Sequence, residues 1–265
     1  MIGFNHISFD DSLKALGPIS LEEMDSIKLM NRIDSKYLTE ESTLLLILAD
    51  AAKAGYRVLM TEGERISPYD SIYYDTAGLN MFYDHHNRRL VRQKVRTREY
   101  VNSGDAFLEI KKKNNKGRTK KKRIHIPKEQ LLDFHGDQEA VEFLDSHSEF
   151  PASSLDKVLE TAFKRITLVN PAKTERLTID TCLEFTNFRT GKRASLNNAV
   201  IIELKQDGRA GSQMKNILLD HRVKPARVSK YCIALTLTDP VAKTGRFKVK
   251  VRRIEKITGN KINVI

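Results

Sequence analysis

The segment VRQKVRTREY, residues 91–100, constrains the fold more than any other part of the chain, because its cations fall at every second position. Side chains of a β-strand alternate between the two faces of a sheet, so Lys94, Arg96 and Arg98 lie on one face of the predicted strand. A half-buried strand normally turns apolar residues toward the core and mixed polar residues toward water. A row of three cations therefore needs a separate explanation.

The same alternation recurs in four other segments, each with one apolar face and one face of ionisable residues of both signs. These segments are NRIDSKYL (31–38), FLEIKKK (107–113), ERLTIDTCLEF (175–185) and VIIELKQ (200–206). Their ionisable faces carry Arg32, Asp34 and Lys36; Glu109, Lys111 and Lys113; Arg176, Asp180 and Glu184; and Glu203 and Lys205. Long basic side chains interleaved with single carboxylates thus follow most of the predicted strands.

Helices and turns are expected between these strands. Ser20 precedes Glu23 by three residues, which is typical of a capping box at the start of a helix. Further helices are expected over 39–55, 128–147, 153–164 and 211–221, and a hairpin turn over 114–119. No linker or repeat divides the sequence. We therefore expect a single domain over 1–265, with an N-terminal extension over 1–19 and a basic tail over 241–265 to which no chemistry is assigned.

The charge of the chain predicts an anionic partner. Lys and Arg number 46 against 34 Asp and Glu, which gives a formal net charge of +12. The two cysteines, Cys182 and Cys232, lack the spacing of zinc ligands or of a disulfide framework, which favours packing roles in a reducing compartment. The N-terminus lacks the order of a signal peptide, and no apolar run approaches the roughly 18 residues that span a bilayer. We expect a cytoplasmic protein without a transmembrane segment.

The charged strand faces have two possible environments. In an open antiparallel sheet they face solvent, which is the common arrangement. Alternatively, the amphipathic helices cover the apolar strand faces, and about eight strands close into a barrel that has no edge. We predict the second arrangement: an α+β fold with an antiparallel tunnel-type β-barrel of about eight strands, helices packed outside, and charged faces lining a water-filled channel. Cations there would require anions.

The width of such a channel limits its ligand. A barrel of about eight strands holds side chains or one small ligand, so duplex nucleic acid does not enter it, whereas a linear triphosphate or polyphosphate does. Arg and Lys form charge-assisted hydrogen bonds with phosphoryl oxygens. Glu109, Asp180 and Glu203 would repel a phosphate unless they bind a divalent cation. The pattern therefore predicts Mg²⁺ or Mn²⁺ as a cofactor.

The order of seven segments over roughly residues 20–240 resembles VTC domains, the polyphosphate polymerase domains among the triphosphate tunnel metalloenzymes, which are related to the CYTH group. The segments are NRIDSKYL, YYDT, YDHHNRRLVRQKVRTREY, FLEIKKKNNKGRTKKKRI, ERLTIDTCLEF, VIIELKQ and SKY. The resemblance implies a tunnel barrel in which basic residues hold phosphates and a glutamate holds the metal. Full-length eukaryotic members also carry membrane spans and a phosphate-sensing domain, and neither is found in this sequence.

The resemblance assigns roles residue by residue. The cations expected to neutralise charge during phosphoryl transfer are Lys36, Arg96, Arg98 and Lys111. The further phosphate-binding residues are Arg32, Lys94, Lys113, Lys122, Arg165, Arg176, Lys205 and Lys230. Glu203 matches the metal-binding glutamate of the family, and the carboxylate argument adds Glu109.

Several functions are compatible with this sequence. The favoured one is metal-dependent phosphoryl transfer from ATP to inorganic polyphosphate. If a carboxylate such as Glu109 orients water, the same tunnel hydrolyses inorganic or nucleoside triphosphates. A non-catalytic polyphosphate-binding module would keep the cations but would not need the carboxylates. The hairpin KKKNNKGRTKKKR (111–123) could bind RNA phosphates, but no RNA-binding module is found and no specific nucleic acid is expected. A membrane-associated partner is also compatible with the sequence.

Overall fold

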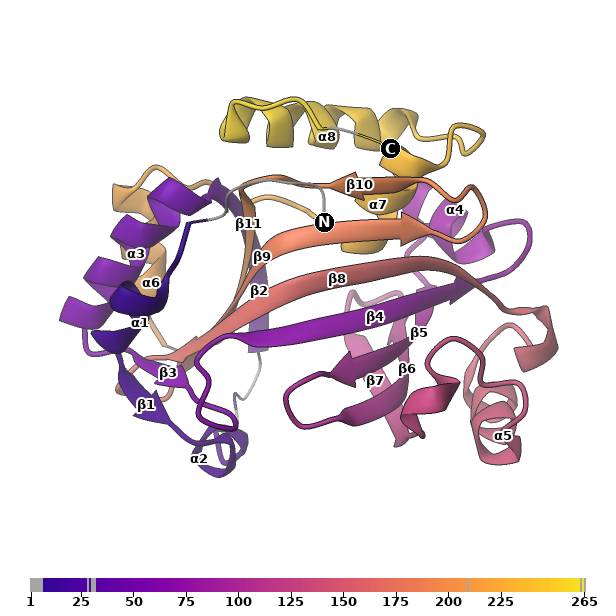
Figure 1. Ribbon diagram of the computed structural model, residues 1–265, viewed down its shortest axis with the longest axis horizontal. Helices are drawn as coiled ribbons and strands as arrows, with labels where there is room; N and C mark the ends of the chain where they lie inside the picture. Colours follow the sequence, from indigo (N-terminus) through magenta and orange to yellow (C-terminus); the bar gives the residue numbers. More distant parts are fainter. Residues whose placement is uncertain (1–6, 28, 30–31, 209, 263, 265) are drawn as a thin grey trace.

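The computed structural model describes residues 7–27, 29, 32–208, 210–262 and 264. Its centre is a strongly curved antiparallel sheet with the strand order β2-β11-β9-β8-β4-β5-β6-β7 (Figure 1). The strands are β2 (Arg32–Glu40), β11 (Ala199–Asp207), β9 (Glu175–Asn187), β8 (Asp156–Val169), β4 (Ser67–Asp75), β5 (Arg92–Tyr100), β6 (Asp105–Lys113) and β7 (Thr119–His125). Since β2 and β7 end this path of pairing, the strands form a curled half-barrel. The predicted α+β class with eight antiparallel strands is confirmed.

Three short strands extend this sheet. They are β1 (Gly17–Ile19), which pairs with β3; β3 (Arg57–Leu59), which pairs with β8; and β10 (Arg193–Ser195), which pairs with β9. The hairpin expected over 114–119 joins β6 to β7, and Gly117 in this turn has a φ of 79°. A positive φ is a conformation that glycine adopts without strain, which explains why the sequence has glycine there.

Helices cover the convex face of the sheet. On one half, α3 (Glu41–Lys53), α6 (Gln213–Asp220) and α1 (Asp10–Lys14) bury the alternate apolar residues of β11 and β9, among them Val200, Ile202, Leu177 and Ile179. On the other half, α5 (Gln138–His147) and the short 3₁₀ turns Lys128–Gln130 and Ala152–Ser154 cover β5 and β6. The remaining short helices are α2 (Leu21–Asp25) and α4 (Asn80–His86). The capping box expected at Ser20 is present at the start of α2.

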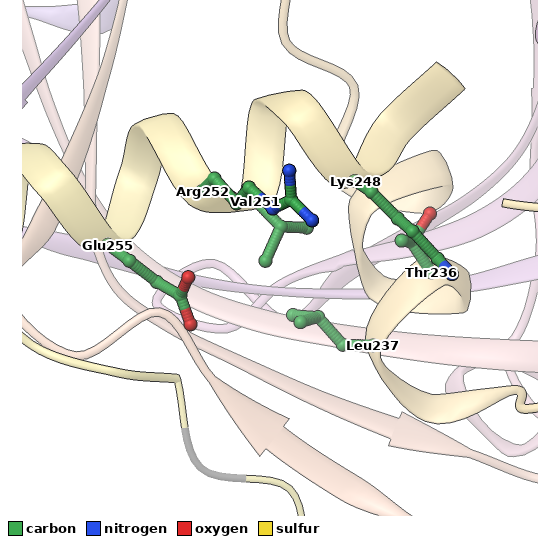
Figure 2. A pocket seen from close by; sticks show the side chains of 6 residues that line it. All are labelled: Thr236, Leu237, Lys248, Val251, Arg252 and Glu255. Carbon is green, nitrogen blue, oxygen red and sulfur yellow. The ribbon is translucent and has the colours of Figure 1, made fainter. Parts of the chain in front are cut away.

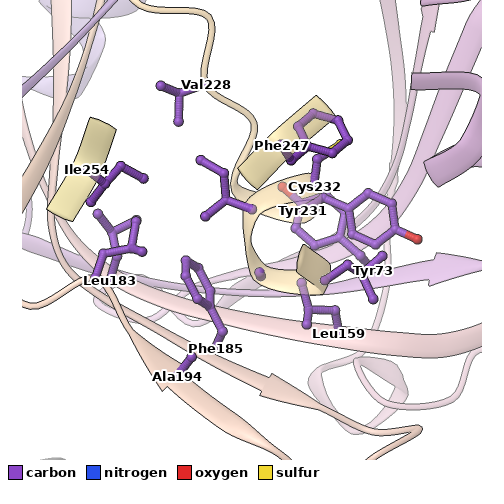
Figure 3. Packing of buried hydrophobic residues seen from close by; sticks show 14 of the residues in the cluster. Tyr73, Leu159, Leu183, Phe185, Ala194, Val228, Tyr231, Cys232, Phe247 and Ile254 are labelled. Carbon is purple, nitrogen blue, oxygen red and sulfur yellow. The ribbon is translucent and has the colours of Figure 1, made fainter. Parts of the chain in front are cut away.

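Two more helices lie on the concave side of the sheet. There α7 (Lys230–Thr238) and α8 (Gly245–Thr258) form one apolar cluster with β4, β8 and β9 (Figure 3). The ring of Tyr231 stacks on Tyr73 at 5.0 Å, and its hydroxyl donates to Asp75 at 2.6 Å. Part of the basic tail is therefore a packed helix, with Phe247 and Ile254 buried. The expectation that all helices pack outside the sheet is therefore wrong for α7 and α8. These two helices lie on the concave side because apolar residues of the strands fill one end of this face.

A β-bulge in β9 explains these apolar residues. Cys182 has a φ of 51°, and the pairing of β8 with β9 shifts register between Ala162 and Lys164. Because a bulge adds one residue to a strand, the alternation changes phase there. Asp180, Leu183 and Phe185 consequently share the concave face, whereas Glu184, which was expected beside Asp180, lies on the convex face.

The segment 153–164 also differs from the expectation. It has helical periodicity in the sequence, but residues from 156 onward form the first half of β8. This strand pairs with β4 on one side and β9 on the other, so tertiary pairing overrides a local preference for helix. No helix in the part of the chain that the structure describes is long and apolar enough to cross a membrane.

Candidate active site

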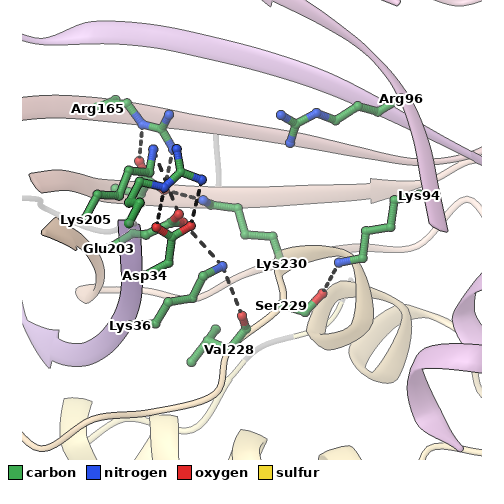
Figure 4. Close-up of polar contacts among 12 residues, drawn as sticks. Asp34, Lys36, Lys94, Arg96, Arg165, Glu203, Lys205, Val228, Ser229 and Lys230 are labelled. Carbon is green, nitrogen blue, oxygen red and sulfur yellow. Dashed lines mark hydrogen bonds and ion pairs between the residues drawn. The ribbon is translucent and has the colours of Figure 1, made fainter. Parts of the chain in front are cut away.

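Charged side chains occupy the half of the concave face that α7 leaves uncovered. Strand pairing brings them together: Lys36 lies opposite Glu203, Arg176 opposite Lys205, Arg165 opposite Asp180, Arg96 opposite Glu109, and Lys94 opposite Lys111. Residues directly opposite in an antiparallel pair point to the same face. Figure 4 shows the side chains of β2, β8, β11 and α7 close together, with the side chains of Lys94 and Arg96 of β5 directed toward them. The strands therefore assemble one shared polar surface.

Asp180 is the centre of one buried ion-pair network. Its carboxylate accepts two hydrogen bonds from Arg165, at 2.6 and 2.9 Å, and it contacts the ammonium group of Lys230 at the start of α7. Burial opposes its ionisation, but Arg165 and Lys230 hold the pKa of Asp180 well below its usual range. Burial lowers the pKa of Lys230 to about 8, although Asp180 partly offsets this effect. The ion pair with Asp180 therefore holds the ammonium group of Lys230 on this polar surface.

Glu109 is the centre of a second buried network. Its Oε2 accepts from Nε and Nη2 of Arg96, at 2.8 and 2.5 Å, and its Oε1 pairs with Lys121 of β7. The side chain of Glu109 is fully buried. Burial opposes ionisation, but Arg96 and Arg98 hold its pKa far below the usual range. Because both of its oxygens are engaged by cations, Glu109 acts as a counter-ion for Arg96.

Arg98 differs from Arg96 although both are on the same strand face and almost fully buried, at 6% and 7% exposure. The Nε of Arg98 donates to the hydroxyl of Ser71 at 2.9 Å, and its guanidinium lies 5.3 Å from the ring centroid of Tyr69. Within the described ranges, no carboxylate lies at ion-pair distance from it. Burial, with the nearby charges of Arg96 and Arg165, lowers the pKa of Arg98 to about 10.

Lys111, like Arg98, has a lowered pKa and no carboxylate partner among the described residues. Arg96, together with burial, lowers its pKa well below the usual value, and among the residues whose placement is described no carboxylate lies within ion-pair distance of its ammonium group. Buried cations without a counter-ion are costly unless an anion compensates them. Arg98 and Lys111 therefore mark the place on the concave face where an anionic ligand would be bound most favourably.

Glu203 is the carboxylate that fits a divalent cation best. Its side chain is 26% exposed and lies 3.4 Å from Lys36 and 4.0 Å from Lys205. Burial opposes its ionisation, but these two lysines keep its pKa far below the usual range, so the carboxylate is charged. In the described parts of the chain, no three His, Cys, Asp or Glu residues gather as metal ligands. A single carboxylate is compatible with Mg²⁺ or Mn²⁺, which take their other ligands from water and substrate phosphates.

The other predicted cations occupy the edges of this surface. Lys94 donates to Ser229 at 2.8 Å, and burial lowers its pKa. Burial lowers the pKa of Lys205 to about 8 and also lowers that of Arg176. Arg32 is exposed and pairs with its strand neighbour Asp34 at 2.6 Å. Lys113 lies opposite Arg92 at the end of β6, on the concave face.

The structure does not bring Lys122 to this surface. In the β6–β7 pairing, Lys122 lies opposite Ile110, on the convex side, whereas Lys121 and Arg123 lie opposite Lys111 and Glu109. The sequence analysis assigned Lys122 to the site and did not assign Lys121 or Arg123. The signal that could have found them is the register of the hairpin, which requires the exact turn geometry, because a one-residue slip exchanges the two faces.

The family model of the VTC domain matches residues 31–238. No curated protein matches the chain. A candidate adenylate cyclase from Vibrio parahaemolyticus is 10% identical, with a TM-score of 0.44 over 75% of this chain and 94% of that chain. A candidate adenylyl cyclase from Hippeastrum, described as having a dominant triphosphatase activity, is 11% identical, with a TM-score of 0.45 over 83% of this chain and 96% of that chain. A protein from Pyrococcus horikoshii is 13% identical, with a TM-score of 0.41 over 75% and 96% of the two chains.

Proposed function

The chain belongs to the VTC domain family, and on this premise we propose that it transfers phosphoryl groups from ATP to inorganic polyphosphate on the concave face of the sheet. The observation that carries the proposal is the pair Arg98 and Lys111. Both cations are largely buried and lack a carboxylate partner among the described residues, while their neighbour Arg96 is neutralised by Glu109. A linear chain of phosphates supplies the missing negative charge along the strands.

The residues of the surface have separate tasks in this proposal. Arg98 and Lys111 bind the transferred phosphoryl group and neutralise the charge that develops on it. Lys36 and Arg96 flank this position on β2 and β5. Phosphoryl transfer depends mainly on positioning and electrostatic stabilisation, so a covalent nucleophile is not required. Fixed cations in a partly dry site are effective because they do not have to reorganise during the reaction.

The remaining residues hold the substrates. Arg165 and Lys230, fixed by Asp180, would contact phosphates on the β8 side, and Lys205 and Arg176 would do so at the far end of β9 and β11. Glu203 would hold Mg²⁺ or Mn²⁺. If bound there, such a metal would supply positive charge that offsets the negative charge of the phosphates. Glu109 is not assigned to the metal or to a base, because Arg96 and Lys121 already engage both of its oxygens.

The experiment that tests the proposal is product analysis. Purified protein is incubated with ATP and Mn²⁺, and the products are resolved by gel electrophoresis. We expect a ladder of polyphosphates that disappears in Arg98→Met and in Glu203→Gln. Lys122→Gln is the matched control, because it removes a cation from the convex side of β7 and is expected to leave the ladder unchanged.

The other outcomes are equally informative. Release of free phosphate without a ladder would assign the site to triphosphate hydrolysis. Tight binding of polyphosphate without turnover would assign a binding role. Equal loss of activity in Lys122→Gln and Arg98→Met, with both variants folded, would show that the activity does not depend on the concave face.

A further inference from the structure

Further cations continue along β5 and β6 from Lys111 toward one end of these two strands. Arg92 lies opposite Lys113 and Lys94 lies opposite Lys111, whereas the next pair along the strands is Arg96 with Glu109. Like charges directly opposite each other in a sheet are destabilising. No carboxylate in the described parts of the chain lies at ion-pair distance from any of these four cations. The positive charges of these two neighbouring cross-strand pairs on the concave face are thus not compensated by carboxylates.

Segments from the C-terminal part of the chain converge on the same end. Lys94 donates to Ser229, which caps α7, so the preceding loop with Arg227 passes beside β5. On α8, Phe247 packs against the rings of His85 and His86 at 5.9 and 5.7 Å, which joins this helix to α4. Arg246 of α8 also donates to the carbonyl of His86 at 3.1 Å. The ammonium group of Lys250, in the next turn of α8, lies 4.9 Å from the centroid of the same Phe247 ring, on the side of α8 that faces α4.

The pKa values of these side chains are shifted in the direction that neighbouring positive charges produce. Burial, followed by the charges of Arg92 and Arg227, lowers the pKa of Lys113. Burial also lowers the pKa of Lys250, on which Arg88 and Arg227 act in the same direction. Burial together with Lys94, Arg92 and Lys250 lowers the pKa of His85 to about 2, so this histidine is neutral and adds no charge. Only the cations remain to attract a ligand.

We propose that Arg92, Lys113, Arg227 and Lys250 form a second phosphate site, which binds the part of a polyphosphate chain that extends beyond the reacting phosphates. The site rests on the proposed function and assigns it a preference for long linear polyphosphate. Lys94 connects the two sites on the face of β5. From Arg98 to Arg92 the strand rises roughly 20 Å, which is longer than a triphosphate and requires a chain of more phosphates. Lys250 lies outside residues 31–238, the part matched by the family model.

The test compares two ligands, long-chain inorganic polyphosphate and tripolyphosphate, by isothermal titration calorimetry with the full chain. In Arg92→Gln and in Lys250→Gln we expect the affinity for the long chain to fall about tenfold, since each variant loses a charge-assisted hydrogen bond. The affinity for tripolyphosphate is expected to change less than about twofold, because its position lies deeper on the sheet.

Lys248→Gln is the matched control on the same helix. Lys248 lines a groove of about 230 Å³ between α7 and α8 together with Leu237 and Arg252 (Figure 2). The variant removes the same charge two residues from Lys250, on a different side of α8, and is expected to leave both affinities unchanged. An equal loss in Lys248→Gln and Lys250→Gln would overturn the proposal, because the effect would then be general attraction to a basic surface.

Two other results would also overturn the proposal. If Arg92→Gln and Lys250→Gln lowered the affinities for both ligands equally, Arg92 and Lys250 would belong to the triphosphate position. If the variants lowered the affinity for single-stranded RNA of matched charge as much as that for long-chain polyphosphate, the site would not be selective for polyphosphate. Failure of the wild-type protein to bind tripolyphosphate or to turn over ATP would instead refute the proposed function.

Discussion

Arg96 and Arg98 are a natural pair for testing whether the concave face is built for an anion. They lie on the same face of β5 and are buried to nearly the same extent, but only Arg96 has a carboxylate partner. We predict that replacing each by methionine, which keeps much of the side-chain volume, has opposite effects on the stability of the ligand-free protein. Arg96→Met should destabilise it, whereas Arg98→Met should stabilise it.

The magnitudes follow from the environments. The fall of the pKa of Arg98 from 12.5 to about 10 corresponds to about 3 kcal/mol against the charged form in the folded state. This cost is present at all pH values below about 10 and is relieved as the pH rises above it. Arg98→Met removes the cost but also loses the hydrogen bond to Ser71, about 1 kcal/mol, and the contact with the Tyr69 ring, about 1 kcal/mol. The net expected gain is about 1 kcal/mol.

For Arg96→Met the sign is reversed. The variant leaves Glu109 charged and fully buried, with Lys121 as its remaining partner. Breaking one side of a buried ion pair costs about 3 kcal/mol or more. The free energies of unfolding of the two variants should therefore differ by about 4 kcal/mol.

Urea denaturation measures this difference. With an m-value of about 2 to 3 kcal/mol/M, the unfolding midpoints of the two variants should be separated by more than about 1 M. The buffer must contain no phosphate, sulfate or nucleotide, because an anion at the site would restore the partner that Arg98 lacks. If both variants were destabilised equally, the prediction would be wrong, because the charge of Arg98 would then be compensated within the ligand-free protein.

Two further predictions concern the same surface. Lys205 and Lys230 have pKa values lowered to about 8, so both lose protons as the pH rises from 7 to 9. The calorimetric affinity of the protein for tripolyphosphate should therefore fall over this range, and an affinity that does not fall between pH 7 and pH 9 would contradict this. Asp180→Asn leaves Arg165 and Lys230 without their counter-ion, which should lower the free energy of unfolding by about 3 kcal/mol or more, and saturating tripolyphosphate should restore part of the loss. An unchanged urea midpoint for Asp180→Asn would be inconsistent with this network.

Much of the concave face could be predicted from the sequence because it depends on local alternation. Lys94, Arg96 and Arg98 share a face in any regular strand, and the same applies to Glu203 and Lys205. The expectation of about eight antiparallel strands agrees with the eight strands in the main path of the sheet. The charged faces then had to converge, because the amphipathic helices needed the apolar faces.

Features that depend on long-range geometry could not be predicted in this way. The bulge at Cys182 changes which face Glu184 occupies, and no local pattern marks it. Lys122 lies on the convex side because the register of the hairpin, and not its composition, decides the face. The first half of β8 has a helical pattern that pairing with β4 and β9 overrides. The buried helix α7 is apolar on all sides, so its periodicity does not tell which face of the sheet it covers.

The proposed function requires that cations from separate strands bind one linear chain of phosphates on the concave face. The most direct measurement is a crystal structure of the protein with a non-hydrolysable ATP analogue and Mn²⁺, using anomalous scattering to locate the metal. We expect phosphates in contact with Arg98 and Lys111, and manganese beside Glu203. Phosphates bound on the convex side of the β6–β7 hairpin, with Arg98 and Lys111 in contact only with water, would contradict it.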